Sequence, residues 1–293
     1  MDFGVFLPRW EEAATPVAWR RVAVTADRFD YDYVGMGDHI VFLEDDRSWG
    51  VELPTSDVFA VLSFVAGLTE DVRIGTNICV VPYRHPVQLA KLALTLDQLS
   101  AGRFEFGVGA GWCEPEFAAL DVPANERGKR TDEFLALFEQ VCAEPIVSFE
   151  GNTVAIEETA FRPRPVQEGG PPIMVGGHSS PAFRRTAQFG DGWLFTTTPA
   201  ELADDRDRIM RAWANFDRSG EPYLAIGNGT GLVDEPTDEP LIGPADHIIR
   251  GIEAYESAGA DRIDFKVSAT AADIDGRVDQ LERLATEVLP SFR

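Results

Sequence analysis

The sequence predicts a (β/α)8 barrel, in which eight parallel strands alternate with eight helices around one closed sheet. The first observation is the alternation itself, since short apolar strands and amphipathic helices follow one another along the chain. The second is the count, because eight strands and eight helices favour a closed barrel over an open, doubly wound sheet. The third is the length of 293 residues, which α/β barrels commonly reach as one domain. We therefore expect a single domain over residues 1–293.

The clearest unit of this fold lies between residues 73 and 112. Arg73–Val81 is rich in apolar and β-branched residues, as in a strand that is buried on both faces. Val87–Leu99 has apolar residues at helical spacing, and Pro86 suits the first position of a helix. Phe104–Val108 is the next strand. A strand, a crossover helix and a second buried strand make a parallel βαβ unit.

The same periodicities place the other elements. Further strands are expected at Phe3–Leu7, Tyr33–Met36, Ile173–Val175, Gly192–Phe195, Leu224–Gly231 and Arg262–Val267. Further helices are expected at Val17–Phe29, Asp57–Leu68, Thr131–Ala143, Pro181–Phe189, Glu201–Arg218, Pro244–Ala258 and Ile274–Leu289. Residues 40–54 have no clear period and are interpreted as a long loop, and the stretch from Trp112 to Lys129 as irregular.

Residues 145–170 interrupt the alternation. Ile146–Phe149 and Thr153–Ile156 flank Glu150–Asn152, which predicts a small β-hairpin. A proline-rich segment then leads back into the core. Because the alternation resumes at once, we interpret residues 145–170 as an insertion within one domain.

The composition is strongly acidic. The chain has 26 Lys and Arg against 49 Asp and Glu, a formal net charge of −23, and lysine occurs only at positions 91, 129 and 266. An ordinary acidic surface would explain this, but we favour adaptation to high salt, which screens the self-repulsion of an anionic surface. Nucleic acids and anionic membranes are poor partners for such a chain, because binding phosphates requires clustered Lys and Arg.

The chain also has features of a cytoplasmic protein. Its three cysteines show no paired spacing and are interpreted as reduced thiols. No apolar run is long enough to span a membrane, and the N-terminus lacks a signal-peptide pattern. The four histidines show no metal-ligand spacing, so we predict no metal site.

In a (β/α)8 barrel the chemistry lies on the loops after the C-terminal ends of the strands. Asp38 and His39 follow the second strand. The acid can fix the imidazole tautomer or the pair can supply a proton, but a surface turn capped by Asp38 explains the pattern equally well. After the third strand, the Asn77 amide can bond a heteroaromatic ring edge, although residue type alone favours ordinary strand interior.

Two glycine-rich stretches follow later strands. Gly107–Gly111 lets the backbone approach a flat or phosphorylated ligand, although glycine-rich matches of this kind are weak. Glu114 and Glu116 come next, and for at least one of them we expect a solvated acidic loop. Gly176–Ser180 opens directly into a helix, where backbone NH groups and serines can bind phosphate. We prefer this interpretation to a simple Ser N-cap.

The motifs resemble the bacterial luciferase-like superfamily, and more narrowly its F420-dependent oxidoreductases. The matching segments are GDH at 37–39, RIGTNICVVPYRHPVQLAKLALTLDQLSAGRFEFGVGAGW at 73–112, ERGKRTDEF at 126–134, PPIMVGGHS at 171–179 and GDGW at 190–193. The resemblance covers most of the chain, and the last third matches only in outline. It implies a (β/α)8 barrel with an insertion, often a homodimer. Together with the acidic composition it implies a halophilic archaeal source.

The resemblance also implies a coenzyme site. A non-prolyl cis peptide at Asn77–Ile78 would back the ring of the coenzyme, and Asp38 and His39 would line its reactive face. Ala110 and Gly111 would contact the ring. The phosphate of the coenzyme tail would be held by Gly176, Gly177 and His178.

The implied reaction is transfer of a hydride between coenzyme F420 and a small organic substrate. His39 would be the proton donor or electrostatic partner, and Asp38 would hydrogen-bond the ring. The alternatives are an FMN-dependent monooxygenase that uses reduced flavin and O₂, and a non-catalytic flavin-binding barrel. Family members that act on sugar phosphates use lysines at the mouth, and no matching lysine is found in the sequence. The tryptophans at positions 49, 112 and 193 favour a flat or apolar substrate.

Overall fold

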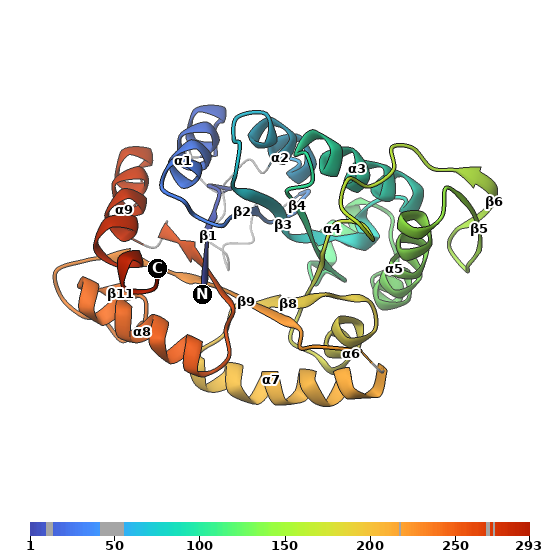
Figure 1. Ribbon diagram of the computed structural model, residues 1–293. Helices are drawn as coiled ribbons and strands as arrows, with labels where there is room; N and C mark the ends of the chain where they lie inside the picture. Colours follow the sequence, from blue (N-terminus) through green and yellow to red (C-terminus); the bar gives the residue numbers. More distant parts are fainter. Residues whose placement is uncertain (10–13, 42–55, 217, 268–269, 272) are drawn as a thin grey trace.

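A computed structural model describes residues 1–9, 14–41, 56–216, 218–267, 270–271 and 273–293. Eight parallel strands close into a barrel in the order β1-β12-β9-β8-β7-β4-β3-β2 (Figure 1). Their bounds are β1 Asp2–Phe6, β2 Tyr33–Met36, β3 Arg73–Val80, β4 Phe104–Gly109, β7 Ile173–Gly176, β8 Gly192–Phe195, β9 Tyr223–Gly229 and β12 Arg262–Lys266. The first and last of them pair in register from Asp2 with Arg262 to Val5 with Phe265, which closes the sheet. The predicted barrel is confirmed.

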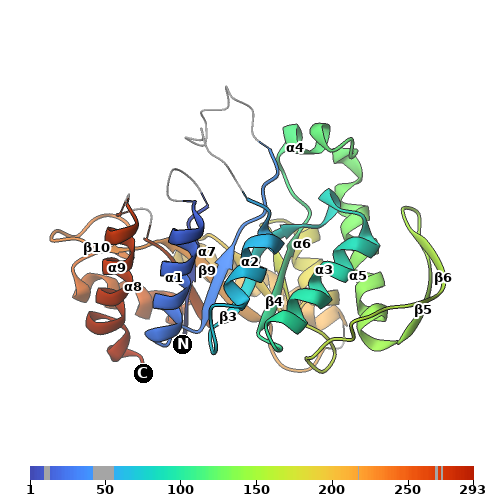
Figure 2. The same ribbon diagram turned by 90° about the horizontal axis from the view of Figure 1, so that it is seen from above.

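A helix follows each barrel strand. These helices are α1 Pro16–Arg28, α2 Val58–Ala66, α3 Pro86–Leu99, α5 Arg127–Ala143, α6 Ser180–Phe189, α7 Pro199–Trp213, α8 Ala245–Ser257 and α9 Ile274–Glu287. In Figure 1, α9, α1, α2 and α3 surround one side of the barrel, and α6, α7 and α8 surround the opposite side. Figure 2 shows the same arrangement turned by 90°.

Several helices begin where the sequence supplies an oxygen to the free amides of the first turn. Thr15, Asp57, Ser179 and Asp273 each accept a hydrogen bond from the backbone NH three residues later. At the start of α7, Thr198 forms a reciprocal capping box with the glutamate three residues on. These local signals explain why the predicted helix starts lie within two residues of the observed ones in most cases.

Two segments differ from the sequence prediction, and a third lies outside the described residues. The stretch expected to be irregular contains a short helix, α4 (Glu114–Ala119), and α5 begins at Arg127 rather than at Thr131. Helix α7 ends at Trp213, five residues earlier than expected, and a 3₁₀ turn follows it. Residues 42–55, which hold most of the expected long loop, lie outside the described part of the chain.

The predicted hairpin is confirmed and projects beside α5 (Figures 1 and 2). Strands β5 (Ile146–Glu150) and β6 (Ala155–Ala160) pair antiparallel, and the second begins two residues later than expected. Glu133 of α5 holds the turn, because its carboxylate accepts hydrogen bonds from the backbone amides of residues 152–154 at 2.8–2.9 Å. That residues 145–170 are an insertion within a single domain stays a prediction.

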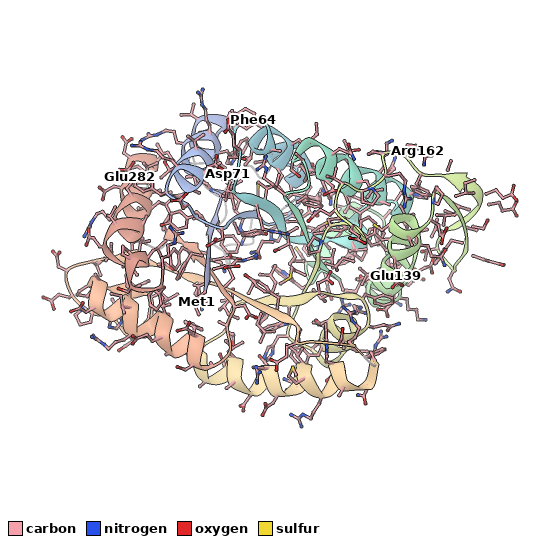
Figure 3. The ribbon with its side chains drawn as sticks, in the orientation of Figure 1. Met1, Phe64, Asp71, Glu139, Arg162 and Glu282 are labelled. Carbon is pink, nitrogen blue, oxygen red and sulfur yellow. The ribbon has the colours of Figure 1, made fainter. Side chains whose placement is uncertain are left out.

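Aromatic rings fill the layer between sheet and helices. Phe106 of β4 lies with its ring centroid 6.0 Å from Phe134 and 5.3 Å from Phe138, both on α5. Glu139 and Glu282, which are labelled in Figure 3, are acidic side chains at the periphery. The aromatic packing joins the strands to the helices around them.

The inside of the barrel holds a buried ionic cluster instead of an entirely apolar core. Both terminal nitrogens of Arg262 donate to Glu105 at 2.8 Å, and Nε donates to Asp264 at 2.8 Å. The guanidinium carbon also lies 3.8 Å from the centroid of the Tyr33 ring. Buried charges of this kind are tolerated only when each is paired and hydrogen-bonded.

Candidate active site

A cavity of about 770 Å³ opens at the C-terminal ends of the barrel strands. All nine residues predicted to form the site line it: Asp38, His39, Asn77, Ile78, Ala110, Gly111, Gly176, Gly177 and His178. They come from the ends of four different strands and are far apart in the sequence. Their common location agrees with the rule that barrel chemistry gathers at this face, while their individual roles stay predictions.

The wall formed by β3 has the backbone feature that the resemblance implied. The Asn77–Ile78 peptide bond is cis, and the register between β3 and β4 shifts between Thr76 and Cys79. The side chain of Ile78 packs between two glycines, since a Cβ added to Gly109 or Gly176 would lie 2.4 or 2.7 Å from it. The absence of side chains at both positions therefore lets Ile78 form an apolar wall of the cavity.

Asp38 lies at the cavity, but its carboxylate is bound to Arg84. Arg84 donates to Asp38 Oδ1 at 2.9 Å and to Oδ2 at 2.5 Å, and the Val80 amide donates to Oδ2 at 3.0 Å. The carboxylate is buried, and Arg84 also pairs with Asp57 at 2.7 Å. This arrangement does not favour the expected hydrogen bond from Asp38 to a coenzyme ring. Its geometry fits a residue that fixes the turn after the cis peptide.

His39 is held by a buried carboxylate. Its Nδ1 lies 3.1 Å from Glu116 Oε2, and the Tyr83 hydroxyl donates to the same oxygen at 2.8 Å. The Ile40 amide donates to the other oxygen at 2.5 Å. Burial raises the pKa of Glu116, but hydrogen bonds from His39, Ile40 and Tyr83 outweigh it, so the net pKa lies below its ordinary value. Glu116 is therefore an anion that fixes the orientation of the imidazole.

The sequence analysis identified His39 as a site residue but did not connect it with Glu116. At least one of Glu114 and Glu116 was expected in a solvated loop, and Glu114 is indeed exposed whereas Glu116 is fully buried. The two glutamates could be told apart only once α4 placed them on different faces. Beside the dyad, the half-exposed ring of Trp112 meets His39 edge-on, with centroids 6.1 Å apart.

Asn77 points from the cavity wall towards the inside of the barrel. Its amide nitrogen donates to Asp264 Oδ2 at 3.0 Å, which joins the cis peptide to the buried ionic cluster. Burial raises the pKa of Asp264 to about 6, with Arg262 opposing the shift and Glu105 adding to it. The side chain expected to bond a ring edge is thus used within the protein.

The wall after β7 differs in detail from the expected phosphate site. Ser179 caps α6 by accepting from the Ala182 amide at 3.3 Å, and Pro181 has no NH to offer. The helix start therefore presents fewer donors than the sequence analysis assumed. Arg127 and Arg185 line the same side of the cavity and supply positive charge.

His178 lies at this wall with its ring fixed on both sides. Its Nε2 lies 2.5 Å from Asp205 Oδ2, and the ring stacks on Phe195 at a centroid distance of 5.2 Å. Trp193, which was considered for substrate binding, is buried in the core and donates to the Gly177 carbonyl at 2.8 Å. Trp49 lies outside the described residues.

The opposite wall contains a lysine that the sequence analysis did not connect with the cavity. Lys266 ends β12, and its Nζ donates to Thr196 Oγ1 at 2.8 Å. Burial and the nearby charge of Arg9 lower the pKa of Lys266 to about 8, partly offset by Asp264. Lys266 is therefore a lysine of the cavity lining that the sequence analysis did not assign to the site. The rule that strand ends carry chemistry would have selected Lys266.

The fold and site together define a class of proteins. A (β/α)8 barrel with a non-prolyl cis peptide at the end of its third strand and a glycine-lined cavity is the framework that the luciferase-like motifs predicted. The family model for luciferase-like monooxygenases matches residues 1–241. The chain belongs to this family, whose members are oxidoreductases and monooxygenases.

The individual relatives and solved structures described next share 27% sequence identity or less with this chain. An uncharacterized protein of Mycobacterium tuberculosis is 27% identical over 237 residues, which covers 76% of this chain and 82% of the relative. The solved structure of the monooxygenase RslO1 from Streptomyces bottropensis matches with a TM-score of 0.86 and 20% identity, covering all of both chains. An F420-dependent secondary alcohol dehydrogenase matches with a TM-score of 0.83 and 16% identity, covering 100% of this chain and 99% of the other.

Among the described residues, no group of three or more His, Cys, Asp and Glu side chains is placed to hold a metal ion. Within the same ranges, no helix is both long and apolar enough to cross a membrane.

Proposed function

We propose that this protein is an F420-dependent oxidoreductase that transfers a hydride between the deazaflavin and a small organic substrate. The observation that carries the proposal is the His39–Glu116 dyad at the cavity wall, beside the cis peptide wall. Reducing a carbonyl, or oxidising an alcohol, requires a proton to move together with the hydride. A histidine held by a buried anion is a suitable group for that proton.

The described residues fit a coenzyme of this kind. The apolar side chain of Ile78 and the backbone of Ala110 and Gly111 offer a flat surface for the ring. Arg127 and Arg185, with the backbone of 176–179, would hold the phosphate of its tail. When bound, F420 supplies a carbon centre that accepts or gives a hydride.

The protein supplies orientation and proton transfer. His39 would hold or release the proton at Nε2, because Nδ1 faces Glu116. Tyr83 and the Ile40 amide keep Glu116 anionic and fixed, so the imidazole cannot turn away. Asp38 acts as a positioning residue, because its pairing with Arg84 and the Val80 amide fixes the loop that carries His39.

A second candidate function is an FMN-dependent monooxygenase that uses O₂. The similarity to the monooxygenase RslO1 and the description of the matching family favour it. The same wall would hold FMN, which also has a three-ring system and a phosphate. Homodimer formation, cytoplasmic location and adaptation to high salt stay predictions, as does the halophilic archaeal source.

Equilibrium binding of F420 and FMN, measured side by side in molar salt, separates the candidates. We expect F420 to bind at least tenfold more tightly than FMN. His39→Asn should reduce turnover of a loaded enzyme about 10²-fold, the lower end for loss of a general acid–base group, while leaving F420 affinity within about threefold. The reverse coenzyme preference would assign the protein to the monooxygenases. Folded protein that binds neither coenzyme would overturn both candidates.

His247→Asn is the matched control for the His39 change. His247 lies on α8, and its Nε2 is 3.0 Å from the Glu239 carbonyl, in an exposed contact away from the cavity lining. It should leave turnover unchanged. Equal losses in both variants would show that the His39 effect is not specific to the site.

A further inference from the structure

The charge of the cavity lining is opposite to that of the chain. The chain carries a net charge of −23, yet the described lining residues include four Lys or Arg and one Asp or Glu. The single acid is Asp38, which Arg84 already neutralises. The four cations are Arg9, Arg127, Arg185 and Lys266, of which Arg185 is paired with Asp132 at 2.6 Å. A cationic cavity in so acidic a protein favours anionic ligands.

The four cations form two groups on opposite sides of the barrel. Arg127 and Arg185 lie on the helices that follow β4 and β7. Arg9 follows β1, and Lys266 ends β12. In the closed order of strands, β1 is four places from β7, and β12 is four places from β4. The two groups are therefore diametrically opposed, so a single phosphate cannot use both.

Lys266 lines the cavity and is partly buried. Its ammonium donates to the Thr196 hydroxyl and lies 4.8 Å from the centroid of the Phe6 ring. Asp264, two residues earlier on the same strand, is its nearest acidic influence, but that carboxylate bonds Arg262 and Asn77. Partial desolvation of a lysine ammonium costs free energy unless an anion compensates its charge.

Arg9 brings a second cation to the same place. Its guanidinium lies against the backbone of Gly37, where a Cβ would overlap one of its terminal nitrogens. Gly37 directly precedes Asp38 and His39, so Arg9 adjoins the segment that carries the proposed proton donor. Burial lowers the pKa of Arg9 to about 10, which still leaves it charged at neutral pH. Two cations from different strand ends thus meet beside the reactive wall.

We infer that Arg9 and Lys266 form an oxyanion subsite for the second substrate, which therefore carries a carboxylate or phosphate group. A guanidinium and an ammonium together match both oxygens of such a group. The inference rests on the proposed function for the role of the opposite wall, where the coenzyme phosphate would be held. It assigns the substrate to the anionic organic compounds rather than to the neutral apolar ones that the tryptophans suggested.

The test is calorimetric titration of the coenzyme-loaded protein with succinate, with inorganic phosphate and with neutral succinamide, at constant ionic strength. We expect one of the two anions to bind and succinamide not to bind, and the stronger anion identifies the group. Lys266→Met should weaken that binding at least tenfold. Lys129→Met is the matched control, because Lys129 is exposed on α5 and does not line the cavity, and should change it less than twofold.

The pH dependence gives a second readout that a folding defect would not produce. Binding of the anion to the wild type should weaken several-fold between pH 7 and pH 9, as Lys266 loses its proton, and this loss should be missing in Lys266→Met. Arg9→Gln should weaken binding at both pH values without removing the pH dependence.

Three results would overturn the inference. The first is absence of binding by either anion. The second is anion binding that Lys266→Met leaves unchanged, which assigns the anion to the wall of Arg127 and Arg185. The third is a tenfold loss of coenzyme affinity in Lys266→Met with intact anion binding, which makes Lys266 a coenzyme residue. If neither coenzyme binds, the proposed function fails, and the same anion titrations on the unloaded protein still decide whether the subsite exists.

Discussion

Two carboxylate clusters of this barrel differ in what their partners can do. Inside the sheet, Glu105 and Asp264 share the guanidinium of Arg262, and all three side chains are buried. At the cavity, Glu116 is equally buried, but its partner His39 lines the cavity. The first cluster pairs anions with a guanidinium that stays protonated, whereas the second pairs an anion with an imidazole, which can accept and release a proton.

This difference separates a structural cluster from a chemical one. Burial raises the pKa of Asp264 to about 6, because Arg262 offsets the desolvation only in part and the neighbouring Glu105 carboxylate adds to the shift. The pKa of Glu116 lies below its ordinary value in spite of burial, because hydrogen bonds from His39, the Ile40 amide and Tyr83 stabilise its charge. An anion that stays charged can orient a neighbouring imidazole. The inner cluster, by contrast, has only internal partners, apart from the Asn77 amide that joins it to the cis peptide.

The largest expected effect is the loss of Arg262. Arg262→Met leaves Glu105 and Asp264 buried without their cation, and breaking such a pair destabilises a protein by about 3–5 kcal/mol. Denaturant titration measures this change. Arg283→Met is the control, because Arg283 pairs with Glu287 on an exposed face, and such pairs contribute about 0.5 kcal/mol. If Arg262→Met lowers the free energy of unfolding by less than about 1 kcal/mol, the inner cluster does not have this structural role.

The next largest effect is the pH dependence of the unfolding free energy that Asp264 causes. The folded state holds the proton of Asp264 more tightly than the unfolded chain does, since its pKa rises from 3.8 to about 6. Its contribution to the unfolding free energy is therefore complete below about pH 4 and is lost as pH rises through about 6. The full loss is up to about 3 kcal/mol. Asp264→Asn should remove this part of the pH slope, measured by denaturant titration between pH 4 and pH 7; an unchanged slope would contradict it.

The smallest change in free energy is expected for the His39–Glu116 dyad at the cavity. Glu116→Gln keeps the shape of the side chain but removes the charge that orients His39. We expect turnover to fall about 10²-fold, or about 2.7 kcal/mol, with coenzyme affinity within about threefold. Glu114→Gln, two residues earlier and exposed, should have no effect on turnover. If turnover falls in neither variant, Glu116 supports only the fold.

Prediction from the sequence succeeded where the signal is local. The strands Tyr33–Met36 and Gly192–Phe195 have the predicted bounds, and helix α3 begins at Pro86 as expected. The spacing of apolar residues and the position of a proline predict these elements, and both signals depend only on neighbouring residues. The cis peptide at Asn77–Ile78 was placed by resemblance of a long motif. Helix α4 was missed because six residues give too short a period to recognise.

The partners of the site residues required the tertiary structure. Asp38 was selected by its position after a strand, but its pairing with Arg84 joins residues 46 positions apart. Lys266 and Arg9 lie at opposite ends of the chain and meet only because β1 and β12 close the barrel. No periodicity encodes such contacts, since they depend on which strand ends become neighbours.

The sequence by itself determined the alternation of strands and helices, the barrel that follows from it, and which strand ends carry polar or glycine-rich loops. Those properties follow from local periodicity and from the rule that parallel strands present their C-terminal ends at one face. Only the tertiary structure decided which carboxylates are buried, which cation each one meets, and where the cavity is positive. Burial and pairing set the charge state of a side chain, and both depend on residues brought together from distant parts of the chain.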